Sequence, residues 1–245
     1  MFDEVLHLEV VDSTHAMMQQ MTERGELVCG RVLSADFQTG GRGQGSNSWH
    51  SNYGQNILMS LCWCPAALSA SRQFGISVAV SMAVVKMLNQ HKIPEVRIKW
   101  PNDIWSGDRK LAGLLVSNTI SGNMITQSIV SLGLNVNEPE FPSELPNPVS
   151  MRMLSGLEYD RMMLLRSLLE LIREHLRLLD RGNIDALNEE YRLHLLGLGQ
   201  KRVFSVAGMI TSCVIKGVDE YGRLRLMHRD GTISAYDMSE IKMLQ

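Results

Sequence analysis

The segment "QTGGRGQGSNSWHS", residues 38–51, contains four glycines, one arginine and one tryptophan. Glycine loses more backbone freedom on folding than any other residue, so such a segment is costly to order. A solvent loop between two strands is the simplest interpretation. An anion-binding loop is the alternative, because glycines let backbone N–H groups approach a phosphate and Arg42 adds a permanently charged, forked donor. Trp49 would then cover a flat ligand with its ring.

Two known phosphate-binding motifs do not fit this segment. A P-loop needs a Lys-Ser or Lys-Thr pair after its glycines, and none follows here. The dinucleotide fingerprint needs a helix directly after the glycines, whereas Trp49-His50-Ser51 leads into a strand pattern. A loop that is mobile when empty and ordered by its ligand would exclude water from a reaction. We therefore predict that residues 40–50 form a lid.

The composition indicates a globular chain without an obvious nucleic-acid or membrane partner. The sequence has 245 residues, of which 44% are hydrophobic and 20% charged, and its net charge is -2. These values suit one or two domains and give no strongly basic surface. No apolar run is long enough for a membrane helix, and the N-terminus lacks the basic start of a signal peptide. A cytoplasmic location is predicted.

The four cysteines are Cys29, Cys62, Cys64 and Cys213. Cys62 and Cys64 are two residues apart in a strand pattern, and without a second ligand pair they make a poor zinc site. We predict buried free thiols in a reducing compartment. The histidines show no metal-binding spacing.

The pattern on both sides of the glycine loop predicts an α+β main domain and a small β domain. Strands are expected at 2–11, 27–37, 56–64, 96–100, 111–118 and 124–135, and helices at 13–25, 71–89, 160–179 and 183–196. Residues 138–150 contain four prolines and are expected to form an extended loop. From residue 201, short strands alternate with tight turns, which is typical of a small antiparallel barrel.

Four further motifs have ordinary structural roles when each is taken alone. They are "VVDSTH" at 10–15, "KWPNDIW" at 99–105, "GDRKLAGLLVS" at 107–117 and "SLGLNVN" at 131–137. A helix cap, a proline turn, a solvated charge and a strand end account for them. In this order, together with Q-x-x-G-R-G and the downstream tryptophan, they resemble the biotin–protein ligase family over essentially the whole chain.

The resemblance implies a fold. It is a mixed β-sheet with flanking helices, related to class II aminoacyl-tRNA synthetases, followed by an SH3-like β-barrel. The expected domains are a catalytic domain at 1–197 and the barrel at 198–245. Some family members carry an N-terminal winged helix that binds DNA. Because the catalytic motifs begin near residue 10, we expect the monofunctional type without it.

The resemblance also implies a two-step reaction. The carboxylate of biotin attacks the α-phosphate of Mg-ATP, which gives biotinyl-5′-AMP and pyrophosphate. The amine of one lysine on a biotin carboxyl carrier protein, part of a biotin-dependent carboxylase, then attacks the mixed anhydride. Neither step needs a nucleophile on the enzyme, so positioning and charge neutralisation should dominate. No nucleic acid or membrane is expected as a partner, and a homodimer stays open.

The site residues follow from the matching motif positions. The expected catalytic residues are Lys110, Arg42 and Asp103. Asp103 is expected to bind or orient either Mg²⁺ or the incoming lysine amine. The expected biotin-binding residues are Ser13, Thr14, His15, Gln38, Gly41, Arg42, Gly43, Gln44, Lys110, Gly113, Ser131 and Gly133. The expected ATP-binding residues are Arg42, Trp49, Asn102, Lys110 and Asn135. Gly113 matches a position where the missing side chain leaves space for biotin.

Several residues depart from the family pattern. His15 stands where many members have Asn, and Ser131 stands where Gly is common. Gln44, Gly45 and Ser46 replace the second basic part and the last glycine of the usual loop, so the lid is expected to hold the adenylate less strongly. Two alternatives are a lipoate–protein ligase, whose arginine-pair, double-glycine signature is missing, and a non-catalytic biotin-binding regulator. The retained Arg42, Lys110 and Asp103 argue against the regulator.

Overall fold

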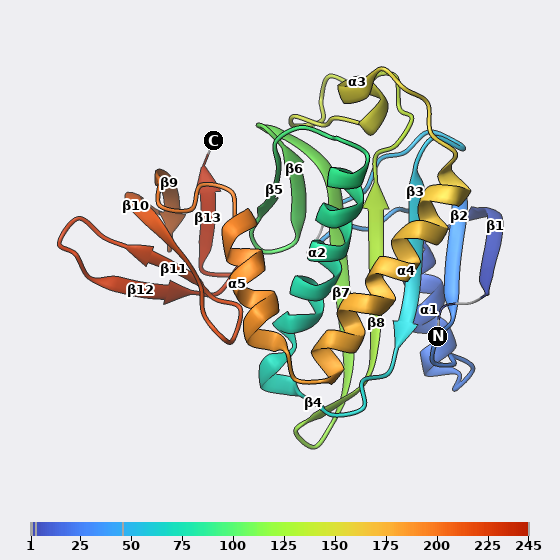
Figure 1. The fold of residues 1–245 in the computed structure, drawn as a ribbon, viewed down its shortest axis with the longest axis horizontal. Coiled ribbons are helices and arrows are strands. Elements are labelled where there is room, and N and C mark those ends of the chain that lie inside the picture. Colours follow the sequence, from blue (N-terminus) through green and yellow to red (C-terminus); the bar gives the residue numbers. More distant parts are fainter. Residues whose placement is uncertain (1, 3, 46, 245) are drawn as a thin grey trace.

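The computed structural model describes residues 2, 4–45 and 47–244, and its centre is a mixed sheet (Figure 1). Among these residues, eight strands form the sheet, with seven in the order β1-β2-β3-β8-β7-β6-β5 and β4 beside β8. Their bounds are β1 Val5–Val11, β2 Val32–Gln38, β3 Ile57–Trp63, β4 Leu68–Ser69, β5 Val96–Lys99, β6 Asp103–Ser106, β7 Arg109–Ser121 and β8 Met124–Leu134. Only β1 and β2 pair in parallel, and the other neighbours are antiparallel.

Helices cover both faces of this sheet. The helices are α1 Thr14–Glu23, α2 Phe74–Gln90, α3 Met151–Ser155, α4 Arg161–Asp180 and α5 Ile184–His194, with a short 3₁₀ turn at Ala70–Arg72. In Figure 1, α2 and α4 cross one face and α1 lies behind the sheet. Helix α1 begins where the Ser13 side chain accepts a hydrogen bond from the Ala16 N–H, and α4 begins at Asp160, which accepts from Met162 and Met163.

The core has two parts, one on each side of the sheet. The larger part lies between the sheet and helices α2, α4 and α5, and α2 is buried almost all round, with twelve of its seventeen residues buried. The smaller part lies beneath α1 and contains Met18, Leu33, Cys62 and Ile129. This second cluster holds α1 against the sheet. The first residue of α1, Thr14, therefore lies beside the C-terminal end of β2, at Gln38.

A second sheet follows helix α5. Strands β9 Lys201–Val206, β10 Met209–Val218, β11 Leu224–Met227, β12 Ile233–Tyr236 and β13 Ile241–Leu244 form it in the order β12-β11-β10-β9-β13. The described strands β12 and β13 do not pair with each other, so this sheet is open and the expected SH3-like β-barrel is not confirmed. Its strands are antiparallel as expected, with a register shift between Ile215 and Gly217.

The predicted elements are confirmed in kind, with some differences at their ends. Residues 27–31 were expected to start a strand, but Glu26 and Leu27 donate backbone hydrogen bonds to Met21, and Gly25 and Gly30 have positive φ. The chain therefore turns tightly after α1, and β2 starts at Val32. Strands β6 and β13 and helix α3 were not predicted, because each has only four or five residues and shows too little periodicity.

One prediction about the cysteines is wrong. Cys29 and Cys64 form a disulfide, so Cys64 is not a free thiol. Cys62 and Cys213 are free and buried, as predicted for Cys62. Burial raises the pKa of the Cys62 thiol to about 11, with a hydrogen bond from Gln127 opposing the shift. The disulfide joins the turn after α1 to the end of β3 across 35 residues of sequence, a pairing that the C-x-C spacing does not reveal.

Candidate active site

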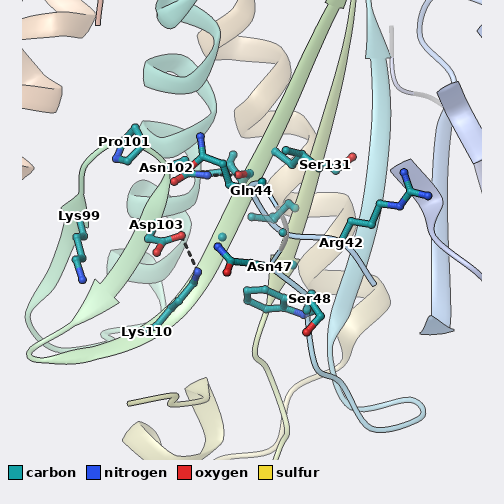
Figure 2. A pocket seen from close by; sticks show the side chains of 18 of the residues that line it. Arg42, Gln44, Asn47, Ser48, Lys99, Pro101, Asn102, Asp103, Lys110 and Ser131 are labelled. Carbon is teal, nitrogen blue, oxygen red and sulfur yellow. Dashed lines mark hydrogen bonds and ion pairs between the residues drawn. The ribbon is translucent and has the colours of Figure 1, made fainter. Parts of the chain in front are cut away.

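A large pocket lies where the motifs meet. It has a volume of about 1010 Å³ and is lined by the start of α1, the glycine loop, the turn after β5, strands β7 and β8, and residues of the second sheet. Such a volume is at the upper end for small-molecule sites and is large enough for two substrates. Figure 2 shows the Lys110–Asp103 pair on one side of this pocket and Ser131 and Arg42 on the other.

The glycine loop forms a tight turn over the pocket. The Gly43 N–H donates to the Asn47 carbonyl at 2.7 Å, and the Trp49 N–H donates to the Gly41 carbonyl at 2.9 Å. A Cβ on Gly41 would lie 2.6 Å from the Trp49 carbonyl, so only glycine fits there. The Gln44 side chain at the tip donates to the sulfur of Met238 in the second sheet. The loop thus spans from the main sheet to the second sheet.

A buried carboxylate anchors the end of this loop. Glu138 is 0% exposed and accepts hydrogen bonds from the Asn52 backbone at 2.6 Å and from the Asn56 side chain at 2.9 Å. Asn56 in turn accepts from the Val136 N–H at 2.8 Å, which joins the loop to the segment after β8. The end of the loop is therefore anchored to the segment after β8.

The indole of Trp49 lies on the glycines of β7 and β8. A Cβ on Gly113 would meet the ring at 3.1 Å, and a Cβ on Gly133 would overlap it. The Trp49 Nε1 atom is buried and has no hydrogen-bond partner among the described residues. The Trp49 ring therefore fills the space beside Gly113 in this structure. Its Nε1–H group could donate a hydrogen bond to an acceptor on a ligand.

Lys110 and Asp103 form an ion pair in the pocket. The Lys110 ammonium lies 2.8 Å from the Asp103 carboxylate and 5.6 Å from the centre of the Trp49 ring. Register places Asp103 of β6 opposite Gly113 of β7, which brings the carboxylate beside the lysine. Lys99 lies nearby, 4.1 Å from the Trp105 ring. Burial, and then the charges of Lys110 and Lys242, lower the pKa of Lys99 against the opposing effect of Asp103.

Hydroxyl and amide groups line the other side of the pocket. Ser13, Thr14 and His15 are 2%, 2% and 4% exposed at the start of α1. The Thr14 backbone and hydroxyl both donate to Gln38 Oε1, at 2.8 and 3.1 Å. His15 contacts Ser131 of β8 through Nδ1 at 2.8 Å. Burial, and then the positive charge of Arg42, lower the pKa of His15 to about 4, so its ring is neutral at pH 7.

The two asparagines expected to contact ATP make backbone hydrogen bonds. The Asn102 side chain donates to the Leu114 carbonyl at 2.6 Å and fixes the turn before β6. The Asn135 side chain donates to the Val149 carbonyl at 3.0 Å, and its Oδ1 atom is buried without a hydrogen-bond partner in the described structure. Asn135 therefore has one side-chain atom left for a ligand, and Asn102 acts on the shape of the turn.

The fold brings most of the predicted residues to one pocket. Those lining it are Ser13, Thr14, His15, Gln38, Arg42, Gly43, Gln44, Trp49, Asn102, Asp103, Lys110, Gly113, Ser131, Gly133 and Asn135. Gly41 is buried beneath the loop and does not line the pocket. Ser46 lies outside the described residues.

Several residues near the site were not predicted. Ser60 of β3 is 0% exposed and donates to the Thr14 hydroxyl at 2.8 Å. Its signal in the sequence is a single serine inside the apolar strand pattern "NILMSLCWC". Lys99, Phe204 and Lys242 also line the pocket. The two from the second sheet could not be found by motif, because their position depends on how the second sheet packs.

Comparison with known proteins agrees with this arrangement. A sequence model of the Biotin/lipoate A/B protein ligase family matches residues 7–137, which is more than half of the chain. The chain belongs to this family. Among curated relatives, the bifunctional ligase/repressor BirA of Salmonella typhimurium is 29% identical over 250 residues, covering 96% of this chain and 73% of BirA. The biotin–[acetyl-CoA-carboxylase] ligase of Mycobacterium tuberculosis is 28% identical over 220 residues, covering 87% of this chain and 79% of that ligase.

Solved structures share the fold of this ligase-family chain. The biotin protein ligase of Aquifex aeolicus, in complex with biotin and ATP, has a TM-score of 0.81 and 22% identity, with all of both chains covered. A biotin protein ligase-like protein of unknown function from Silicibacter has a TM-score of 0.73 and 16% identity, with 96% of each chain covered. Because the fold also occurs in a protein of unknown function, the activity must be argued from the pocket.

Proposed function

We propose that this chain is an ATP-dependent biotin–protein ligase that forms biotinyl-5′-AMP and transfers biotin to a lysine of a carrier protein. The observation that carries the proposal is the distribution of groups in one pocket. The hydroxyl and amide groups of Ser13, Thr14 and Gln38 line the pocket. Ser131 lines it too and lies across it from the Lys110 ammonium (Figure 2). A ligand with a hydrogen-bonding ring and a carboxylate tail complements this arrangement.

In the proposed adenylation, Lys110 acts through its charge. It stabilises the negative charge that develops as the biotin carboxylate attacks the α-phosphate. Its present partner, Asp103 at 2.8 Å, holds the ammonium in position before the substrates arrive. An ion pair at the edge of a pocket is easily exchanged for a stronger anion, because both side chains are partly exposed, at 33% and 23%.

The glycine loop supplies the second part of the proposal. Arg42 is exposed and lies across the pocket from Lys110 (Figure 2). Closure of residues 40–50 would bring Arg42 and the backbone N–H groups of Gly41 and Gly43 to the phosphate, which shields the reactive anhydride from water. Trp49 would leave the surface of Gly113 and Gly133 and cover the nucleotide.

Mg²⁺ is expected to arrive with ATP. The described residues contain no cluster of three or more metal-binding side chains, and Asp103 is the one acidic residue among those that line the pocket. A single carboxylate fits Mg²⁺, which keeps several waters and is held largely by substrate phosphates. When bound, the ion would neutralise phosphate charge. Asp103 would then serve as its protein ligand, once the Lys110 ammonium has turned to the substrates.

The remaining parts of the proposal concern the partner and the organisation. We propose a biotin carboxyl carrier domain as the acceptor, a division into domains at 1–197 and 198–245, and a cytoplasmic location. Among the described residues, no helix has the length and apolar character that crossing a membrane requires.

The test is transfer of biotin to an acceptor domain. Purified chain, Mg-ATP and biotin are incubated with a biotin carboxyl carrier domain, and the modified lysine is located by mass spectrometry. We expect one lysine to gain biotin, and no label when that lysine is replaced by arginine. Lipoate is offered in parallel with a lipoyl carrier domain. Labelling with lipoate and not with biotin would assign the chain to the other branch of the family.

A further inference from the structure

Six side chains form one continuous series of hydrogen bonds behind and along the pocket wall. They come from α1, from strands β3, β7 and β8, and from the last residue of β2. His15 joins Ser117 at 2.9 Å and Ser131 at 2.8 Å, Ser131 joins Ser60 at 2.6 Å, and Ser60 joins Thr14 at 2.8 Å. The series ends at Gln38 Oε1, 3.1 Å from the Thr14 hydroxyl.

One backbone group fixes the orientation of the Gln38 amide. The Thr14 N–H lies 2.8 Å from the Gln38 side chain. A backbone N–H can only donate, so the atom that it contacts is the amide oxygen and not the nitrogen. The amide nitrogen of Gln38 must then point elsewhere, and it donates to no other residue in the described part of the chain.

From this fixed acceptor, the direction of every other hydrogen bond follows. A hydroxyl has a single proton to donate. The Thr14 proton goes to Gln38, so Ser60 must donate to Thr14. The contact between Ser131 and Ser60 must then use the Ser131 proton. Each hydroxyl therefore donates toward Gln38 and accepts from the residue before it.

His15 closes the series at its other end. Because the Ser131 proton is already used, His15 must donate to Ser131 from Nδ1. A neutral ring then has an unprotonated Nε2, which accepts from the Ser117 hydroxyl. Burial of the ring, and then the charge of Arg42, lower the pKa of His15 to about 4 and keep it in this neutral form.

The series leaves a defined pattern of groups facing the pocket. Thr14, Gln38 and Ser131 line the pocket, whereas Ser60 and Ser117 lie outside its lining. Gln38 presents amide protons only. Ser131 presents a lone pair, because its proton is directed to Ser60. A cyclic urea has one carbonyl acceptor and two N–H donors, so it complements both groups.

We propose that Ser131, held by His15, accepts a hydrogen bond from one ring N–H of the substrate's urea and thereby selects for that N–H. The inference rests on the proposed function and deepens it. Ser131 would be a specificity-determining residue in direct contact with the ligand, and His15 a positioning residue acting through it. Both are positions where the sequence was expected to depart from the family pattern, and in the structure the two side chains contact each other.

The experiment pairs protein variants with isosteric ligands. Binding of biotin is compared by calorimetry with binding of the two cyclic carbamate analogues, in which one or the other ring N–H is replaced by oxygen. In the wild type, we expect one analogue to bind about 10- to 100-fold more weakly than biotin, because its oxygen faces the Ser131 lone pair. In Ser131→Ala, this penalty should fall to about 3-fold or less.

Ser128→Ala is the matched control. Ser128 lies on the same strand, is 0% exposed, and its hydroxyl has no partner among the described residues. It should keep the wild-type penalty for both analogues. His15→Ala keeps the Ser131 hydroxyl but removes the Nδ1–H donor that holds it in place, so the hydroxyl is free to rotate and the penalty should fall here also. A variant that moved biotin and both analogues equally would point to a structural role.

The outcomes separate this inference from the proposed function. If the wild type binds neither biotin nor an analogue, the proposed function fails. If the wild type binds biotin but Ser131→Ala keeps the full carbamate penalty, the proposed function stands and the role of Ser131 is refuted. Circular dichroism of each variant checks that it is folded. If His15→Ala does not fold, the comparison of Ser131→Ala with the wild type still tests the proposal.

Discussion

Lys110 is the single residue on which the proposed adenylation depends most. Lys110→Gln keeps the length and polarity of the side chain and removes its charge. We expect the rate of biotinyl-AMP formation to fall by about 10²-fold or more, as when one preorganised electrostatic donor is removed. The thermal unfolding midpoint should change little, because the Lys110–Asp103 ion pair is partly exposed. Single-turnover kinetics with labelled ATP measures the rate.

Lys86→Gln is the control for this experiment. Lys86 forms a comparable ion pair with Glu174 at 3.1 Å, on the exposed surface of α2 and α4. The Lys86→Gln variant should adenylate biotin at the wild-type rate. Equal rates for Lys110→Gln and Lys86→Gln would remove Lys110 from the mechanism.

His15 gives a second prediction at this scale, concerning stability and pH. The pKa of His15 is lowered in the folded protein from 6.5 to about 4 by burial and by Arg42. A base with a lowered folded pKa stabilises the fold above its unfolded pKa, and this contribution is lost as the pH falls from 6.5 toward 4. We expect His15 to account for a loss of about 2 kcal/mol in unfolding free energy between pH 7 and pH 5.

The measurement is urea unfolding of the wild type and His15→Asn at both pH values. Asn does not titrate, so the difference between the two proteins should shrink as the pH is lowered. A difference that is the same at pH 7 and pH 5 would mean that His15 titrates normally in the folded protein.

At the scale of the element, the glycine loop is the part expected to move. Its turn is held by a few backbone hydrogen bonds and by the contact between Gln44 and Met238, whereas its end is anchored at buried Glu138. Arg42→Gly should leave a folded protein that releases biotinyl-AMP prematurely, because the anhydride loses its charged partner. Trapping the released adenylate after a single turnover measures this rate, for which we expect an increase of about 10-fold or more.

Proteolysis provides an independent readout of the same loop. The free protein should be cut within residues 40–50, and a non-hydrolysable adenylate analogue should protect it.

Arg229→Gly is the control for adenylate release by Arg42→Gly, because Arg229 is exposed in a turn of the second sheet and does not line the pocket. If Arg42→Gly retains the adenylate as long as Arg229→Gly does, the backbone amides of the loop hold it without Arg42.

Some helices and strands could be predicted from the sequence alone, and others could not. Helices α2 and α4 were predicted because an apolar pattern that continues over seventeen and twenty residues is too long for a strand. The short strands β6 and β13 were missed, because their pairing comes from neighbours and not from their own pattern. The antiparallel strands of the second sheet were predicted from their short apolar patterns and tight turns. These patterns do not show whether the sheet closes into a barrel, because closure depends on how the edge strands β12 and β13 meet.

The same distinction applies to the site. Ordered motifs predicted most of the site residues that line the pocket, through their resemblance to the family. The contacts of those residues could not be predicted. The disulfide between Cys29 and Cys64, the ring of Trp49 on Gly133, and the series from His15 to Gln38 all join residues that are distant in sequence.

At the scale of the whole molecule, the second sheet completes the pocket. The Trp100 indole donates to the Gly222 carbonyl at 2.8 Å, and Phe74 packs against Gly222, whose φ is 90°. A Cβ at this position would overlap the Phe74 ring. Gly222→Ala should therefore loosen the contact between the two sheets. We expect the KM for ATP to rise several-fold, because Phe204, Lys242 and their neighbours would no longer line the pocket reliably.

Gly231→Ala separates the two effects of that substitution. Gly231 lies in the same sheet with a φ of 86°, and nothing lies within 4 Å of a Cβ placed there. It should lose about 1 kcal/mol of stability from backbone strain alone, whereas Gly222→Ala should lose about 2 kcal/mol more from overpacking. Equal stabilities and equal KM values for the two variants would show that the contact at Gly222 does not position the second sheet.

The central claim is that this pocket activates biotin with ATP, and isotope exchange between pyrophosphate and ATP tests it most directly. Labelled pyrophosphate, ATP and Mg²⁺ are mixed with the purified chain, with biotin, with lipoate or with neither, and incorporation of label into ATP is measured. The reversible first step predicts rapid exchange that requires biotin and is reduced about 10²-fold or more in Lys110→Gln. Exchange that requires lipoate, or no exchange with either acid, would contradict the claim.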